Sequence, residues 1–181
     1  MNVEALTAVL LIFGAACYLF LGSRLIAAGR DVGSVPIGAI FLLMAVWVSG
    51  GAIELLSASF EVFSIGRSGH FVATALLPVA AFACFREYTG NKIPVGTIGL
   101  LALIPFVSIT LAATNYWHQL MWRAPFADSS GVFLSRPVEW GPWFLFVHAP
   151  YSYLLILAAI ASLLMHSSAV AAGHRRCLLY T

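Results

Sequence analysis

The sequence predicts an all-α fold, a polytopic bundle of five transmembrane helices. Hydrophobic residues make up 61% of the chain and charged residues only 9%, and the apolar residues gather in five long runs. A soluble domain of this length needs more charged side chains than this to cover its surface. We therefore expect the chain to fold in the lipid bilayer.

Each apolar run approaches the ~20 residues with which a helix crosses a hydrocarbon core of ~30 Å. The first carries Glu4 and lacks a basic leader, which indicates a retained span and not a signal peptide. The third is the shortest and contains Pro78, and only counting from Gly69 to Phe85 brings it to about 17 residues, the lower limit for a span. The chain is predicted to be a single transmembrane domain, residues 1–181, with spans at about residues 3–21, 37–56, 69–85, 95–113 and 143–165.

Basic side chains are divided unequally between the two sets of connections, and they accumulate on the cytoplasmic side of a membrane. We expect the amino terminus outside, the carboxyl terminus in the cytoplasm and the connection at residues 114–142 on the outer face of a bacterial inner membrane. The basic residues of the cytoplasmic side are Arg24, Arg30, Arg86, Lys92, Arg175 and Arg176, and those of the outer side are Arg67, Arg123 and Arg136.

The composition argues against several kinds of partner. The net charge of +2 comes from scattered residues, whereas nucleic acid binding requires a clustered basic face. Cys17, Cys84 and Cys177 fall in separate segments without a Cys-x-x-Cys spacing, so no disulfide framework or zinc site is indicated. The histidines are not matched in depth as haem ligands on facing helices are. We expect no metal, no cofactor and no nucleic acid partner.

The outer connection is the first candidate site for recognition. Aromatic and polar residues lie before and after a turn-rich loop at residues 124–137. We expect this loop to cover the mouth of the bundle. Its tryptophans are also typical of an anchoring belt that needs no ligand. Asn115 either contacts a ligand or caps the end of a helix, and His118 shares a face with Thr114 if the fourth helix continues past Ala113.

Further polar side chains lie within the spans. Glu54 comes about 25 Å along the second run, near the outer boundary of the hydrocarbon, where a carboxylate needs a partner or water. His148, Tyr151 and Ser152 fall on one stripe of the fifth helix and either form the wall of a ligand site or bond to another helix. Candidate partners of Glu54 are Arg67, His70, Asn115 and His118.

No catalytic residue is predicted. The candidate ligand-binding residues are Glu54, Asn115, His118, Trp122, Trp143, His148 and Tyr151.

Six motifs occur in a characteristic order. They are Trp47 with Glu54, Phe85-Arg86-Glu87-Tyr88-Thr89-Gly90, Ile104-Pro105, Thr114-Asn115 with His118 and Trp122, Gly141-Pro142-Trp143-Phe144, and Tyr151-Ser152-Tyr153. In this order, over about residues 5 to 176, the chain resembles the amino-terminal seven-transmembrane sensor region of bacterial histidine kinases. The resemblance implies a sensor module of a two-component system, placed ahead of cytoplasmic signalling domains and responsive to an external or membrane-borne cue. That family has seven spans, so with five the chain is either a fragment or a natural five-span protein.

We therefore expect a membrane sensor module without catalytic output. It binds a small-molecule or membrane-borne ligand, and it transmits the binding signal as a shift of the fourth and fifth spans. The alternative is an accessory subunit that scaffolds a larger, energy-transducing membrane complex. A stoichiometric membrane-protein partner would favour the subunit, whereas further spans and a kinase or cyclase encoded after Thr181 would favour the sensor. A transporter is disfavoured because paired broken helices are lacking.

Overall fold

The computed structural model describes residues 3–29, 34–91, 93–123 and 139–179. Five helices in these ranges are long and apolar enough to cross a membrane, which confirms the predicted all-α transmembrane bundle. They are α1 (Val3–Ala28), α2 (Ser34–Leu56), α3 (Phe60–Tyr88), α4 (Val95–Ala113) and a last helix that begins with a π-helical turn, η1 (Phe144–His148), and continues as α6 (Ala149–Leu179). A single short turn, α5 (Asn115–His118), follows α4.

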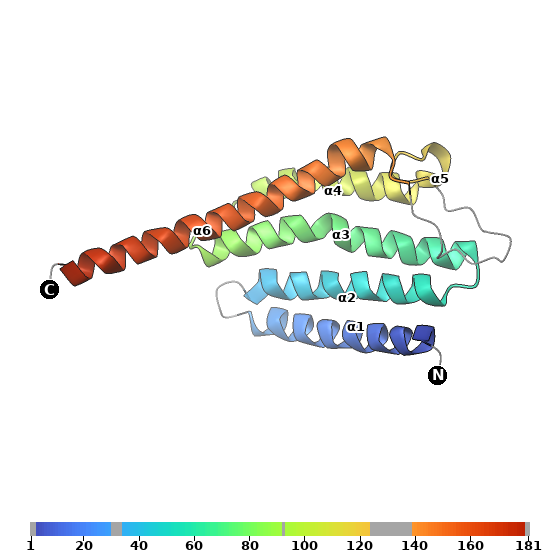
Figure 1. Cartoon of the computed structure of the whole chain (residues 1–181), viewed down its shortest axis with the longest axis horizontal. Coiled ribbons are helices and arrows are strands. Elements are labelled where there is room, and N and C mark those ends of the chain that lie inside the picture. The colour runs from blue at the N-terminus through green and yellow to red at the C-terminus, as the bar shows by residue number, and fades with distance from the viewer. Residues whose placement is uncertain (1–2, 30–33, 92, 124–138, 180–181) are drawn as a thin grey trace.

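The helix α3 is central to the bundle. It packs against α2 on one side and against α4 and α6 on the other, while α1 packs against α2. Figure 1 shows α1, α2 and α3 side by side, with α4 and α6 beyond α3 and the carboxyl-terminal part of α6 projecting past the other helices. The amino terminus, the α2–α3 connection and α5 lie at one end of the bundle, which we call the junction end, and the carboxyl terminus lies at the other.

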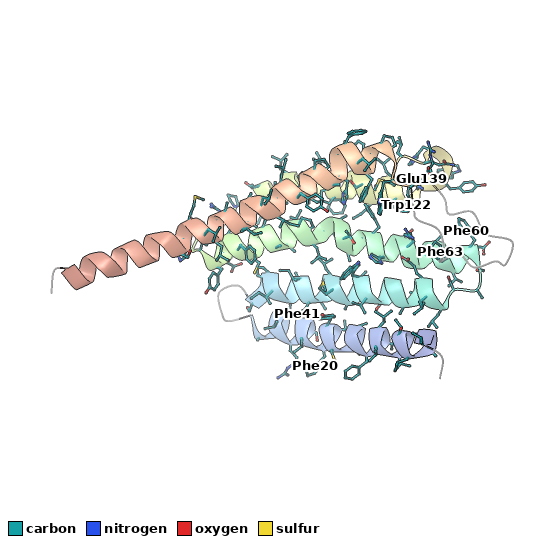
Figure 2. All side chains as sticks on the ribbon, in the orientation of Figure 1. Phe20, Phe41, Phe60, Phe63, Trp122 and Glu139 are labelled. Carbon is teal, nitrogen blue, oxygen red and sulfur yellow. The ribbon has the colours of Figure 1, made fainter. Side chains whose placement is uncertain are left out.

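Large apolar side chains cover the outside of the bundle. Phe13 on α1 and Leu100 on α4 are 68% and 70% exposed, and Phe20 lies on the outer side of α1 (Figure 2). Exposed apolar surface on this scale is unfavourable in water, but it is favourable where the neighbours are lipid chains. The bundle is therefore built for hydrocarbon on its outer faces.

The helix α3 is much longer than the predicted span at residues 69–85. It begins at Phe60, because the Ser59 side chain accepts a hydrogen bond from the Val62 backbone N–H and caps the helix. Its first turns contain Glu61, Ser64, Arg67, Ser68 and His70, which dilute the hydropathy of the sequence. Several of these polar residues line cavities at the junction end. The structure thus explains why hydropathy alone made this span appear short.

The close packing of α2 and α3 depends on two glycines. A Cβ atom at Gly50 would lie 2.7 Å from the Gly66 carbonyl oxygen and 2.7 Å from the His70 backbone nitrogen, and a Cβ at Gly66 would lie 2.9 Å from the Gly50 oxygen. Real Cβ atoms do not approach backbone so closely, so the two helices touch only because both side chains are hydrogen. Small residues permit this approach between membrane helices.

We predict that Gly50→Ala separates α2 from α3 and destabilises the protein, since overpacking a close contact costs about 1–3 kcal/mol. Thermal unfolding of the purified protein in mild detergent measures the effect. Gly51→Ala is the matched control, because a Cβ at this neighbouring position meets no atom within 4 Å. Equal melting temperatures for the two variants would contradict the packing described here.

Candidate functional site

Three ionisable side chains meet between α2 and α3 at the junction end. The Glu54 carboxylate lies 3.6 Å from Arg67 Nε and 3.5 Å from His70 Nδ1. Glu54 follows Gly50 by about one helical turn, and Arg67 comes directly after Gly66, so the glycine contact brings the charges together. Both partners were among those predicted for Glu54.

His70 is oriented by α2 as well as by its own helix. The Trp47 indole N–H donates a hydrogen bond to His70 Nε2, and the two rings meet edge to face with centroids 5.3 Å apart. The indole nitrogen can only donate, so His70 Nε2 is the acceptor of this bond, and Nδ1 is the nitrogen that faces Glu54. The cluster therefore pairs the acidic side chain of Glu54 with the basic side chain of Arg67.

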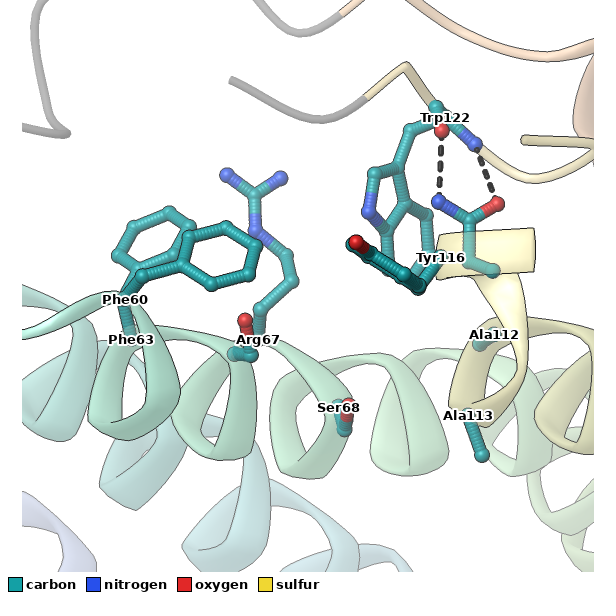
Figure 3. A pocket seen from close by; sticks show the side chains of 10 residues that line it. Phe60, Phe63, Arg67, Ser68, Ala112, Ala113, Tyr116 and Trp122 are labelled. Carbon is teal, nitrogen blue, oxygen red and sulfur yellow. Dashed lines mark hydrogen bonds between the residues drawn. The ribbon is translucent and has the colours of Figure 1, made fainter. Parts of the chain in front are cut away.

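Arg67 links this cluster to the connection between α4 and α6. Its side chain extends from α3 between the rings of Phe63 and Trp122 (Figure 3). The guanidinium carbon lies 5.2 Å from the centre of the Phe63 ring, within the ~6 Å of a cation–π contact. A small cavity of about 100 Å³ lies here, and Tyr116 also lines it. Arg67 therefore lies beside an aromatic-lined cavity as well as the Glu54 carboxylate.

A larger cavity of about 260 Å³ surrounds the cluster, and we call it the junction cavity. Its charged and polar side comes from α2 and α3, and its aromatic side comes partly from the α4–α6 connection, which lies at the same end of the bundle (Figure 2). Phe71 packs against Trp122, and Trp140 stacks on Phe144 with centroids 3.9 Å apart. The lining residues are Glu54, Arg67, His70, Phe71, Thr74, Trp122, Trp140 and Phe144.

Asn115 holds the first half of the connection in place. Its amide donates to the Trp122 carbonyl at 2.6 Å and accepts from the backbone N–H groups of Met121 and Trp122 at 2.9 and 3.3 Å. The residue is only 5% exposed, and the dashed lines at Trp122 in Figure 3 mark these two bonds to it. Asn115 thus fixes the tryptophan that lines the junction cavity.

The second half of the connection returns beside the first. Trp122 and Trp140 form an antiparallel bridge, and the exposed Arg123 and Glu139 side chains form an ion pair at 2.9 Å. A Cβ at Gly141 would lie 2.2 Å from the Leu120 carbonyl oxygen, so only glycine fits where the chain re-enters the bundle. The excursion predicted at residues 124–137 lies outside the described residues, as do Arg30, Lys92 and Arg136.

His118 has a local structural role. The helix α4 ends at Ala113, so the continuous helix considered for Thr114 and His118 is not formed. His118 nevertheless contacts Thr114 Oγ1 through Nε2 at 3.0 Å, and its Nδ1 accepts the Leu120 backbone N–H at 3.0 Å. Both ring nitrogens are occupied by the turn that His118 stabilises.

Trp143 and Tyr151 connect the last helix to α4. Trp143 Nε1 donates to the buried Ser108 hydroxyl at 3.0 Å, and the Tyr151 hydroxyl donates to the Leu101 carbonyl. Pro105, four residues after Leu101, has no N–H for that carbonyl, so the tyrosine replaces the missing helical donor. These two predicted ligand contacts are interhelical bonds in this structure.

His148 is buried at the end of the π-helical turn. It is 2% exposed, its ring lies 4.9 Å from that of Phe71 and 5.5 Å from that of Phe144, and its Nδ1 has no hydrogen-bond partner among the described residues. The expected stripe of His148, Tyr151 and Ser152 is divided, because Tyr151 bonds to α4 while the other two line a groove between α3 and α6.

Of the seven predicted site residues, two line the junction cavity, Glu54 and Trp122. Arg67 and His70 were named only as partners, although their three-residue spacing places them on one helical face. Trp47 precedes Glu54 by about two helical turns, and this spacing predicts that the two residues lie on the same face of α2. Phe144 belonged to the Gly141-Pro142-Trp143-Phe144 motif, whereas Phe71 and Thr74 had no such signal, since phenylalanines and single threonines occur throughout the spans.

A family model described as the N-terminal 7TM region of histidine kinase matches residues 5–180 of the chain. Neither the curated proteins nor the solved structures contain a match.

We predict that Asn115→Ala destabilises the protein by about 2–4 kcal/mol, because it leaves several buried backbone groups without partners. The melting temperature in mild detergent is the measurement. Asn91→Ala serves as the matched control, since Asn91 is exposed and, among the described residues, its side chain is seen to bond to Thr89, two residues away. If the two variants melted alike, Asn115 would not be the clamp of the connection.

Proposed function

Because the chain belongs to the family of N-terminal seven-transmembrane regions of histidine kinases, we propose that it is the sensor module of a bacterial signalling receptor. It recognises its ligand in the junction cavity and has no catalytic output of its own. The observation that carries this proposal is the loosely paired cluster of Glu54, Arg67 and His70 in that cavity.

The geometry of the cluster favours recognition over a purely structural ion pair. Charge-assisted hydrogen bonds in proteins are about 2.7–2.9 Å long, whereas the two contacts of Glu54 are 3.5 and 3.6 Å. Glu54 Oε1, Arg67 Nε and His70 Nδ1 are buried and have no hydrogen-bond partner among the described residues. Buried polar groups normally have partners. A ligand that bonds to these atoms would therefore gain binding energy at little reorganisation cost.

The cavity wall supplies a route for the signal. Glu54 belongs to α2, His70 to α3, and Phe144 to the turn that begins the last helix. A ligand that fills the cavity contacts all three and so favours one spacing of α2, α3 and η1 over another. A ligand shifts a conformational equilibrium only through such differential contacts. The shift reaches the far end of the bundle through α6, the helix that leads to the carboxyl terminus.

The junction end is proposed to face the outside of the bacterial inner membrane. Arg67 and Arg123 belong to this end, whereas Arg24 and Arg86 lie near the opposite ends of their helices. Arg175 and Arg176, near the end of α6, add to the basic residues of that opposite end, and this excess supports a cytoplasmic location for it. The cavity would then sample the exterior and the outer leaflet, while α6 leads to the cytoplasm.

We predict that Glu54→Gln makes the sensor unresponsive, because Arg67 loses its counter-charge and the cavity loses an acceptor. The full chain is joined to the cytoplasmic domains of a histidine kinase, and the phosphorylated response regulator is measured in cells grown across a range of external pH, osmolality and membrane stress. The range of output should shrink about fivefold or more, the size of a typical coupling between sites. Glu61→Gln, the same change at an exposed position of α3, should leave the range intact. A full response from Glu54→Gln would refute recognition in the junction cavity.

The orientation has its own test. Starting from a chain with its native cysteines replaced by serine, we predict that Tyr116→Cys, at a residue 80% exposed, reacts with a membrane-impermeant maleimide on spheroplasts. Asn91→Cys, in the connection between α3 and α4, should react only after the membrane is opened. The reverse pattern of labelling would invert the orientation.

A further inference from the structure

A lateral groove of about 550 Å³ lies between α2, α3 and α6, beside the junction cavity. Its volume falls within the ~300–1,000 Å³ of small-molecule sites, and its lining is almost entirely apolar. The residues that line it are Trp47, Thr74, Leu77, Pro78, Ala81, Phe85, Phe144, His148, Ala149, Ser152, Tyr153, Ile156 and Ile160. From Thr74 to Phe85 the groove follows about 16 Å of α3 at 1.5 Å per residue.

The groove and the junction cavity share parts of their walls. Thr74 and Phe144 line both of them. Trp47 lines the groove, and its N–H bonds to His70 in the cavity. One elongated molecule can therefore contact both, with one end at the charged cluster and the other along the groove.

Two buried polar groups without partners in the described part of the chain belong to the groove. His148 Nδ1 and Ser152 Oγ are buried without hydrogen-bond partners among the described residues. Thr74 also lines this part of the groove, and its carbonyl lacks the usual helical donor because Pro78, four residues later, has no N–H. Beyond these groups the walls are Leu77, Ala81 and the other apolar residues. The groove thus suits a molecule with a hydrogen-bonding head and an apolar chain.

The charge of the cluster sets the charge of that head. Glu54 is paired with Arg67, and His70 Nε2 already accepts the Trp47 N–H. A charged head would enter a half-buried site whose own charges are already compensated, and burying an unpaired charge is costly. An uncharged head with hydroxyl or carbonyl oxygens avoids this cost and can bond to His148, Ser152 and the cluster.

From these observations we propose that the ligand is a membrane-borne amphiphile with an uncharged, oxygen-bearing head and a single apolar chain. The head lies where the junction cavity meets the groove, at Thr74 and His148, and the chain lies along the groove between α3 and α6. Prenylated quinols and monoacylglycerols both have this chemistry. The inference rests on the proposed function of the junction cavity and gives it a ligand class.

The test uses the full chain in lipid nanodiscs with photoreactive analogues of a prenylated quinol and of a monoacylglycerol. We expect at least one of them to crosslink to residues 74–85 of α3 or to residues 144–160 of η1 and α6. The unlabelled neutral compound should compete for this crosslinking, whereas a fatty acid and an alkyltrimethylammonium of equal chain length should not. Of the quinol and monoacylglycerol analogues, the one that crosslinks at the lower concentration identifies the class of lipid from which the ligand comes.

Variants that fill or alter the groove sharpen the test. Ala81→Trp should weaken crosslinking about tenfold or more, because the added indole occupies the groove. The steric cost of overpacking a filled site is large enough to lower affinity by this factor. Ala15→Trp is the matched control, since Ala15 is equally half-buried but lines a depression between α1 and α2. His148→Phe keeps a ring of similar size but removes the polar head contact, and it should also weaken binding.

Three results would overturn the inference: crosslinks spread evenly over the lipid-facing helices, equal competition by charged amphiphiles, or binding by Ala81→Trp equal to that of Ala15→Trp. If Glu54→Gln still silenced the chimaeric receptor in any of these cases, the sensor function would stand and only the ligand class would fall. If neutral amphiphiles bound in the groove while Glu54→Gln signalled normally, the role of the junction cavity would fall instead.

Discussion

The contact between Gly50 and Gly66 is the constraint on which the rest of the junction end depends. Two backbones approach here without intervening side chains, and this approach places a carboxylate of α2 beside an arginine and a histidine of α3. In hydrocarbon an isolated Glu54 would be costly, and the cost is relieved only if α2 and α3 stay in this register. Packing and charge pairing therefore specify the same arrangement of two helices.

The remaining helices build outward from this pair. The central α3 contacts α2, α4 and α6. A movement of α3 at the charged cluster therefore changes its packing against the other helices. The connection after α4 is fixed by the Asn115 side chain, and the last helix is tied to α4 through the Trp143 indole and the Tyr151 hydroxyl. The aromatic wall of the junction cavity is thus held by hydrogen bonds, whereas its polar side is held by a looser ion-pair cluster.

Hydropathy alone predicted the fold class, because a helix needs about 20 mostly apolar residues to cross the hydrocarbon core. It predicted α4 to the residue and shortened α3, whose first turns carry polar residues for the cavities. Glu54 was recognisable as a charge inside a span, and Arg67 and His70 as its partners. Asn115, His118, Trp143 and Tyr151 looked equally suited to ligands or to turns and helix contacts, since both uses need the same polar atoms. Only the three-dimensional arrangement separates them.

A charge reversal across α2 and α3 tests the central claim most directly. In the receptor fusion, Glu54→Arg and Arg67→Glu are made singly and together, and the regulated output and melting temperature are measured. The account predicts that each single reversal abolishes regulation and lowers stability, and that the double reversal restores a substantial part of both, because the opposite charges meet again. A double variant no better than the worse single variant would show that these two residues do not act as a pair and would contradict the account.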